Sequence, residues 1–524
     1  MVFTTLKFLV FFCIVFFAYY LVPKKIQWIV LLIASVYFYL CASVKYVIYV
    51  ILATLITYLG ALVIDRYVKN QQYFLKKYKD TLPKENKKIY KKRIEGKKKK
   101  ALIITIITTL SMLIVMKYAD FFLQNVSAIL NIFKINFSSP AWNFVLPLGI
   151  SFYTFMSIGY VIDVYREEYE AERNFFKYFL YISYFPHILQ GPMDKYSELS
   201  IDLFSGKTFN YNEAVVGMYR IVVGIIKKMV VADKLAPVIT AVTTNVQDYY
   251  GINILIAIVL YAIQLYADFS GYMDIAIGCS KMLGIKIAEN FDAPYFSKSI
   301  AEYWRRWHIS LGAWFRDYVY YPILRGKKSE KIRKFFKNKN NKFLANNMPT
   351  VFALSILWIL IGFWHGSTWA FILYGMYHGS IIIISTLLAP VYDKFYKKFP
   401  NLIKTKIYSA FQIARTFGLV LIGYFLFCVG NLSTSIKMFG NMFLINSNGK
   451  SILDLLSKDT GMGVILGTII ILILDYFIIK KIDIYEKLRT SKLVVRWLVY
   501  CIGLYVIFLF APGGTTQEFL YFQF

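Results

Sequence analysis

The chain alternates long apolar runs with short polar segments over its whole length. About 20 mainly apolar residues are enough to cross a bilayer as a helix. Runs close to this length lie near 6–22, 26–43, 46–66, 101–117, 145–163, 174–190, 213–232, 252–267, 349–364, 367–390, 408–430, 460–479 and 494–511. The pattern predicts an all-α polytopic membrane protein with about 11–13 membrane segments.

Some of these runs contain helix-breaking residues, so we expect two or three of them to be re-entrant. Pro147, Pro186 and the Gly191-Pro192 pair interrupt the central runs. Irregular backbone at membrane depth is tolerated only where it is buried in protein or lines a cavity. The interruptions therefore indicate a polar interior.

Composition agrees with a membrane protein and narrows the function classes. The chain is 58% hydrophobic and 19% aromatic and carries 60 Lys+Arg against 30 Asp+Glu, a net charge of +30. A disordered chain and an ordinary soluble domain are excluded by a mean hydropathy of +0.52. The five cysteines stand singly without a CxxC pair, which favours neither a disulfide framework nor a metal site.

The positive charge is concentrated in four segments, 69–100, 325–342, 391–407 and 480–496, which together hold +27 of the +30. Basic segments are retained on the cytoplasmic side, so we expect these four to be cytoplasmic loops that set topology and contact membrane lipids. No nucleic-acid recognition motif accompanies them, and nucleic-acid binding is not expected. Counting crossings then places both termini outside the plasma membrane, with the first apolar run as a span and not a cleaved signal peptide.

The run before His365 has an informative length. Pro349 to Trp364 is 16 residues, which as a helix rises only about 24 Å. If Pro349 starts at the cytoplasmic face, His365 lies inside a hydrocarbon core of about 30 Å. A titratable group at that depth is a functional candidate. Asp268 and Asp274 also stand in an apolar run, and we expect them to pair with Lys, Arg or helix ends in structural roles.

All four histidines lie in aromatic-rich stretches punctuated by Gly or Pro, and none lies in a basic segment. His308 follows Tyr303-Trp-Arg-Arg-Trp, His365 stands in Trp364-His-Gly, His378 stands in Tyr377-His-Gly, and His187 follows Pro186. No HExxH motif or paired carboxylate–His spacing occurs, so the sequence does not support a metal centre.

These motifs resemble those of the membrane-bound O-acyltransferase family. The resemblance runs from about 145 to 380 and is nearest to the bacterial AlgI-like alginate O-acetyltransferases and DltB-like D-alanyl transferases, with the chain length closer to the AlgI-like members. It rests on several motifs in one order: Leu146-Pro-Leu-Gly-Ile-Ser, Tyr160-Val-Ile-Asp-Val-Tyr-Arg, Asp268-Phe-Ser-Gly-Tyr-Met-Asp, Tyr303-Trp-Arg-Arg-Trp-His, Phe315-Arg-Asp-Tyr and Trp364-His-Gly.

The resemblance implies a catalytic role for His365, reached by a central tunnel through the membrane, with His308 as its companion. Neutral imidazole suits acyl transfer from a thioester to a hydroxyl because it tolerates burial and acts as a base near neutral pH. From the residues alone, His365 could equally be a buried histidine bonded to a carbonyl, and His308 could orient an interfacial helix. We expect packing roles for His187 and His378. The candidate substrate-binding residues of the tunnel are Trp304, Arg305, Trp307, Ser310, Arg316 and Trp364. For the arginines, membrane anchoring is the alternative role.

The final residues, Thr515 to Phe524, resemble the aromatic ending of bacterial O-acyltransferases that work with surface partners. Tyr521 supplies a phenol oxygen, on the outer side in the predicted topology, and is the candidate acyl relay. The alternative is a tail that packs its aromatic side chains into the membrane interface.

The resemblance therefore predicts a membrane O-acyltransferase that moves an acetyl group from a cytosolic donor to a cell-surface polysaccharide. Acetyl-CoA is the expected donor, an acyl carrier protein is the alternative, and an extracellular SGNH-type acyltransferase is the expected partner; no bound cofactor is expected. The alternatives are teichoic acid D-alanylation, a lipid or polysaccharide transporter, and a non-catalytic scaffold. The expected parts are N-terminal helices 1–134, a catalytic core 135–390, C-terminal helices 391–511 and an extracytoplasmic tail 512–524.

Overall fold

The computed structural model describes residues 2–42, 44–135, 137, 147–188, 191–445 and 449–511. Within these residues the chain is helical without a β-strand, and one isolated bridge joins Phe291 to Trp307. Nine helices of the described part are long and apolar enough to cross a membrane, and α1 (Leu6–Leu21) and α5 (Ile150–Tyr165) are shorter apolar helices. The prediction of an all-α polytopic membrane protein is confirmed.

The long helices correspond to most of the apolar runs. The 3₁₀ turn Lys24–Ile26 continues into α2 (Gln27–Ala42) as one candidate span. The other eight are α3 (Val47–Lys77), α4 (Lys84–Ile132), α10 (Ile252–Met282), α15 (Lys342–His365), α16 (Trp369–Leu387), α19 (Lys406–Val429), α21 (Lys458–Ile479) and α23 (Leu493–Phe510).

The described residues form two compact units. The first contains Leu6–Ala214 and Cys279–Ile287, and the second contains Val2–Thr5, Val215–Gly278 and the residues from Ala288 onward. The histidine motifs at 308, 365 and 378 all belong to the second unit, whereas His187 belongs to the first.

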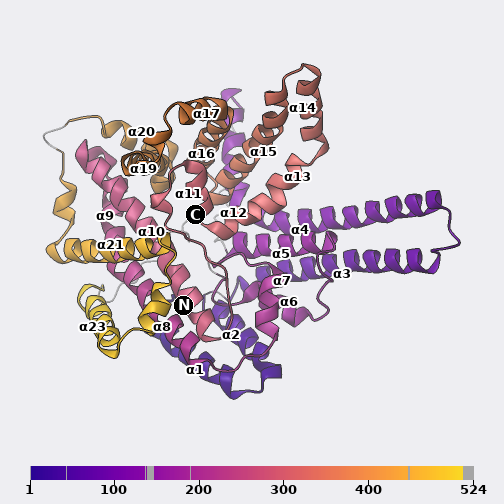
Figure 1. Cartoon of the computed structure of the whole chain (residues 1–524), viewed down its shortest axis with the longest axis horizontal. Helices are drawn as coiled ribbons and strands as arrows, with labels where there is room; N and C mark the ends of the chain where they lie inside the picture. The colour runs from indigo at the N-terminus through magenta and orange to yellow at the C-terminus, as the bar shows by residue number, and fades with distance from the viewer. Residues whose placement is uncertain are drawn as a thin grey trace. The chain divides into compact units, whose positions relative to one another are not determined.

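The first unit corrects the prediction that residues 69–100 form a loop. Helices α3 and α4 run side by side as a long antiparallel hairpin, and only residues 78–83 are outside them (Figure 1). Lysine is a good helix former, so a lysine-rich segment next to an apolar span continues the helix. Phe74 of α3 stacks on Tyr90 of α4 with ring centroids 4.0 Å apart, which joins the two helices near their turn.

Helices also occupy the other three basic segments, which were predicted as loops. They are α14 (Lys327–Asn338), α17 (Ala389–Lys398) with α18 (Pro400–Ile403), and α22 (Ile484–Arg489). The apolar run 174–190, in contrast, contains a shorter helix than its length predicts. Its helix α6 (Phe175–Ser183) has nine residues, too few to cross a bilayer, and ends before the turn around Pro186.

In the second unit, buried charges join a broken helix to α10. The broken helix consists of α8 (Tyr211–Ile225), a π-helical turn (Ile226–Ala232) and α9 (Asp233–Thr244). The Lys228 ammonium lies 2.6 Å from a carboxylate oxygen of Asp268 and 2.8 Å from one of Asp233. All three side chains are almost fully buried, so each charge depends on the others for compensation.

A second set of ion pairs lies next to the first along α10. Asp274 accepts from Lys227 at 2.7 Å and from Arg220 at 2.8 Å, and Arg220 also pairs with Glu289 at 2.5 Å. Pairing of Asp268 and Asp274 with basic side chains, expected from the sequence, is thereby confirmed. The backbones can approach this closely because both helices have glycine at the crossing: a Cβ on Gly224 would lie 2.5 Å from the Gly271 carbonyl oxygen.

Replacing Lys228 by methionine tests the importance of this buried cluster. We expect Lys228→Met to lower stability by about 3–5 kcal/mol, because it removes the ammonium that both carboxylates contact. The matched control is Lys281→Met, which removes a half-exposed pair with Glu213, 3.1 Å long, and should cost at most about 1 kcal/mol. Thermal melting of the detergent-purified variants measures both, and equal melting temperatures for the two would contradict the expectation.

Candidate active site

The site is built around a short pairing of two segments in the second unit. One segment, 290–292, follows α10, and the other, 306–309, joins α11 (Ile300–Arg306) to α12 (Ile309–Phe315). Backbone hydrogen bonds run from Asp292 N to Arg306 O at 3.0 Å and from Ile309 N to Asn290 O at 3.1 Å. His308 lies at the junction of the two helices with φ +46° and ψ +56°, a left-handed conformation that costs a non-glycine residue about 1–3 kcal/mol.

Asn290 holds this strained turn and orients the imidazole of His308. Its Oδ1 accepts hydrogen bonds from the Ser310 backbone N at 3.0 Å and the Ser310 hydroxyl at 2.7 Å, and lies 3.3 Å from Nδ1 of His308. An amide oxygen only accepts, so Nδ1 of His308 must be the protonated nitrogen in this contact. The other ring nitrogen, Nε2, then carries the lone pair.

His308 is enclosed by aromatic side chains. Its side chain is buried, and its ring lies edge-to-face on Phe269 of α10 with centroids 4.8 Å apart. Burial lowers the pKa of His308 to about 3, which favours the neutral imidazole at physiological pH. A neutral imidazole can accept a hydrogen bond at Nε2.

His365 ends α15 and is equally buried. The next residue, Gly366, is extended, and the chain re-enters a helix at Trp369. The His365 ring lies edge-to-face on Tyr374 of α16 at 5.6 Å and on Phe427 of α19 at 5.0 Å. Three helices therefore fix its orientation.

Trp364 brings the two histidines into one site. Its ring centroid lies 5.8 Å from that of His308 and 4.9 Å from that of His365. These two distances limit the separation of the imidazole centroids to about 10.7 Å. The structure therefore brings together His308, His365 and Trp364, which lie up to 57 positions apart in the sequence.

His378 of α16 extends the aromatic cluster away from His365. Tyr374 contacts both rings, with its centroid 4.7 Å from that of His378. The ring of Trp304 also packs on this cluster, with its centroid 5.2 Å from that of His378 and 5.1 Å from that of Trp358. His378 is fully buried among these side chains.

The remaining predicted binding residues have different environments. Trp307 is buried against Phe291, 5.1 Å away, and Ser310 bonds to Asn290 as described above. Arg305 is exposed, and Arg316 pairs with the adjacent Asp317 at 3.1 Å while remaining largely exposed. In the contacts described for this part of the chain, neither arginine reaches a histidine ring.

Two candidate residues lie elsewhere. His187, in the first unit, donates from Nε2 to the Tyr181 carbonyl oxygen at 3.0 Å, an arrangement suited to a packing role. Tyr521 belongs to 512–524, outside the described residues. Among the residues that are described, no group of three or more His, Cys, Asp or Glu side chains is placed to hold a metal ion.

The structure also corrects the start of the helix before His365. Helix α15 begins at Lys342, where Asn341 caps it by accepting from the Leu344 N–H, and Pro349 lies inside it. The helix therefore has 24 residues and rises about 36 Å, more than the thickness of a hydrocarbon core. Helix length alone consequently does not place His365 within the bilayer, and its burial by neighbouring helices is the better evidence for a shielded site.

Comparison with known proteins identifies one family. The model of the membrane-bound O-acyltransferase family matches residues 100–395, which include His308, Trp364 and His365 but not Phe427 or Tyr521. A probable alginate O-acetylase of Azotobacter vinelandii is 34% identical over 65% of this chain and 62% of its own length. The matched region thus spans less than two thirds of that relative.

Two other relatives carry different names. A peptidoglycan O-acetyltransferase of Helicobacter pylori is 27% identical over 96% of this chain and 92% of its own length. A teichoic acid D-alanyltransferase of Bacillus subtilis is 28% identical over 55% of this chain and 70% of its own length.

Two glycines of α19 provide a matched test of packing around His378. A Cβ at Gly423 would lie 2.6 Å from Nε2 of His378, whereas a Cβ at Gly418 meets nothing within 4 Å. We expect Gly423→Ala to destabilise the protein by about 1–3 kcal/mol, because the enclosed ring cannot move away. Gly418→Ala should be neutral or stabilise by up to about 1 kcal/mol through helix propensity. Thermal melting measures both, and a Gly423→Ala variant as stable as Gly418→Ala would contradict this packing.

Proposed function

The chain belongs to the membrane-bound O-acyltransferase family, and from this premise we propose that it transfers an acetyl group from a cytosolic donor to a cell-surface polysaccharide. The observation that carries the proposal is the pair of buried imidazoles, His308 and His365, packed on the single side chain of Trp364. Transfer of an acyl group from a thioester to a hydroxyl needs a base of near-neutral pKa, and imidazole is the side chain best suited to that task.

In the proposed reaction, His365 accepts the proton of the attacking hydroxyl as the new C–O bond forms at the thioester carbonyl carbon. The C–S bond then breaks, and the departing thiolate takes the proton back from the imidazolium. His308 assists by position: its neutral ring packs on Trp364, which also contacts the ring of His365. The aromatic side chains around both rings exclude water, which would otherwise hydrolyse the thioester.

Acetyl-CoA is the proposed donor and a sugar polymer the proposed acceptor. The names of two relatives, an alginate O-acetylase and a peptidoglycan O-acetyltransferase, support O-acetylation of a surface polysaccharide. Teichoic acid D-alanylation from an acyl carrier protein is the second candidate, favoured by the Bacillus subtilis relative. A transporter, in which the histidines would relay protons, is the candidate of a different class.

Tyr521 is proposed as the relay on the outer face of the plasma membrane. Its phenol oxygen would carry the acetyl group as an aryl ester, and an extracellular SGNH-type acyltransferase would pass the group to the polymer. This step depends on the topology predicted from the basic segments and on the sequence of the tail, since Tyr521 lies outside the described residues.

His365→Ala tests the proposal in cells. We expect the variant to lose at least about 100-fold of surface acetylation, since it lacks the general base, while the amount of exported polymer stays normal. Ester-linked acetate released from the cell surface by mild base gives the readout, normalised to membrane-inserted protein. Loss of the polymer itself would indicate a transporter, and loss of ester-linked D-alanine would indicate the second candidate.

Tyr521→Phe provides a separate arm of the same assay, because it removes the oxygen and keeps nearly all packing. Full surface acetylation in this variant would eliminate the relay and leave the role of His365 unaffected.

Asn290 variants test whether orientation of His308 contributes to the reaction. Asn290→Asp keeps an acceptor for the same three donors, whereas Asn290→Leu removes it. We expect Asn290→Leu to lose acetyl transfer by at least about tenfold, a part of the 10²–10⁴ that acid–base catalysis contributes. In Asn290→Asp the carboxylate favours the imidazolium and raises the pKa of His308. As the pH is lowered, this variant should therefore lose activity at a higher pH than the wild type does. Transfer rates measured against pH decide this, and equal losses in both variants without a pH shift would leave Asn290 a purely structural role.

A further inference from the structure

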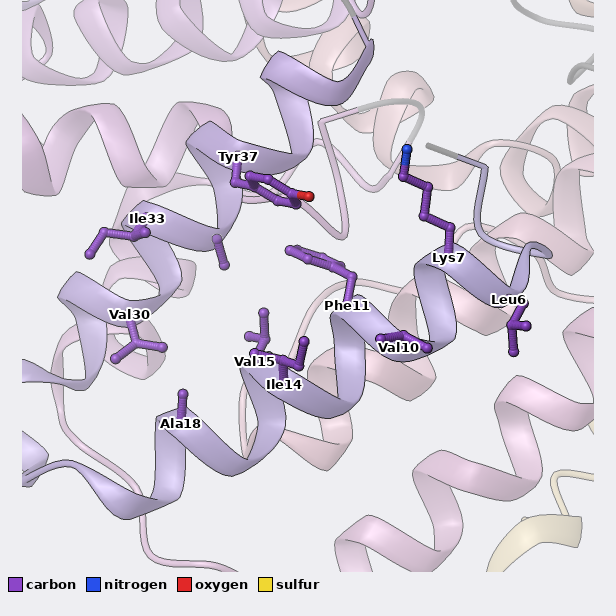
Figure 2. Close-up of a pocket in the computed structure, with 11 residues that line it drawn as sticks. Leu6, Lys7, Val10, Phe11, Ile14, Val15, Ala18, Val30, Ile33 and Tyr37 are labelled. Atoms are coloured by element: carbon purple, nitrogen blue, oxygen red, sulfur yellow. The ribbon is translucent and has the colours of Figure 1, made fainter.

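An apolar groove lies between α1 and α2 in the first unit, whereas the histidine motifs at 308, 365 and 378 belong to the second. It encloses about 840 Å³ and is lined by α1 from Leu6 to Ala18 and by α2 from Val30 to Tyr37 (Figure 2). Its floor is buried at Phe11 and Val15, and its rim is formed by exposed side chains such as Val10 and Ile33. Twelve residues of helix rise about 18 Å, close to the depth of one leaflet of a hydrocarbon core of about 30 Å.

A second apolar groove lies on the other side of α2. It encloses about 420 Å³, and its lining includes Leu40 of α2, Ile51 of α3 and Phe176 of α6. Both grooves share Ile33 and Tyr37, so these two side chains form a ridge with one groove on each side. The arrangement offers two apolar channels that share the side chains of Ile33 and Tyr37.

The first groove has polar atoms at one end only. Figure 2 shows the Lys7 ammonium and the Tyr37 hydroxyl at the same end, beyond the ring of Phe11, which stacks on Tyr37 with centroids 5.8 Å apart. Lys7 is exposed and belongs to the first turn of α1. A lysine at the end of an apolar helix extends its ammonium to the membrane interface, where lipid phosphates lie.

We propose that this ridge and its two grooves bind one anionic diacyl phospholipid. One acyl chain occupies each groove, the headgroup lies beyond Tyr37, and the phosphate pairs with Lys7. The predicted topology puts this end of α1 at the outer face, so the bound lipid belongs to the outer leaflet.

The geometry favours a lipid over a protein occupant. A transmembrane helix is about 10 Å wide with side chains and would fill one groove, leaving the second groove and the cation without a role. A diacyl phospholipid has two flexible chains joined at one anionic head, and it accounts for both grooves, the shared ridge and the Lys7 ammonium at the end of the first groove.

Native mass spectrometry of the full chain, released from nanodiscs of equal phosphatidylglycerol and phosphatidylethanolamine, tests the proposal. Wild-type protein should retain one phospholipid, with phosphatidylglycerol preferred at least about fivefold. Lys7→Gln should lose this preference, whereas Lys45→Gln, which removes an exposed lysine between α2 and α3, should keep it. Val10→Trp, which fills the first groove, should retain no lipid. Val63→Trp, at an exposed apolar position of α3 outside both grooves, should behave as wild type.

Several outcomes would overturn the proposal. These are equal retention of the two lipids by the wild type, an unchanged preference in Lys7→Gln, or retained lipid in a Val10→Trp variant that elutes as a folded monomer. A dimer that Val10→Trp abolishes would instead make the groove an interface with a second copy. If Val10→Trp does not fold, Lys7→Gln decides alone, since it changes only an exposed side chain.

Discussion

Charge compensation between the π-helical turn and α10 is the constraint on which the second unit depends. Lys228 is almost fully buried and contacts Asp268 and Asp233, and isolated ions at such positions would each cost several kcal/mol. The pairing fixes α10 against its neighbour at a crossing where glycine lets the backbones touch. Phe269 directly follows Asp268 on α10 and contacts the ring of His308. The ion pairs therefore position one wall of the candidate active site.

Asn290 stabilises the strained turn at His308 and also fixes the tautomer of the His308 ring. One amide oxygen meets the two donors of Ser310 and the Nδ1 nitrogen of His308, so the backbone and the tautomer are held by the same atom. Its amide nitrogen donates to the sulfur of Met273, one helical turn along α10 from Phe269. The hydrogen bonds to Asn290 thus offset the free-energy cost of the left-handed backbone at His308 and orient its ring.

The sequence predicted the helical class, the histidine motifs and the pairing of Asp268 and Asp274, because apolar periodicity and local motifs are visible along the chain. Asn290 was missed. It lies 18 positions before His308 and meets it only through tertiary pairing of two short segments. The helical state of 69–100 and the early start of α15 were missed for a different reason. Charge and proline often mark helix boundaries, but lysine supports helices and Pro349 lies inside a helix packed against its neighbours.

We propose that His365 and His308 form one acyl-transfer site that serves the far side of the membrane. Inside-out membrane vesicles from expressing cells, supplied externally with acetyl-CoA labelled in the acetyl group, test it most directly. The account predicts that ester-linked label accumulates on lumenal material in wild-type vesicles and stays at background in vesicles carrying His365→Ala. Equal lumenal label in both preparations, at equal protein content, would contradict it.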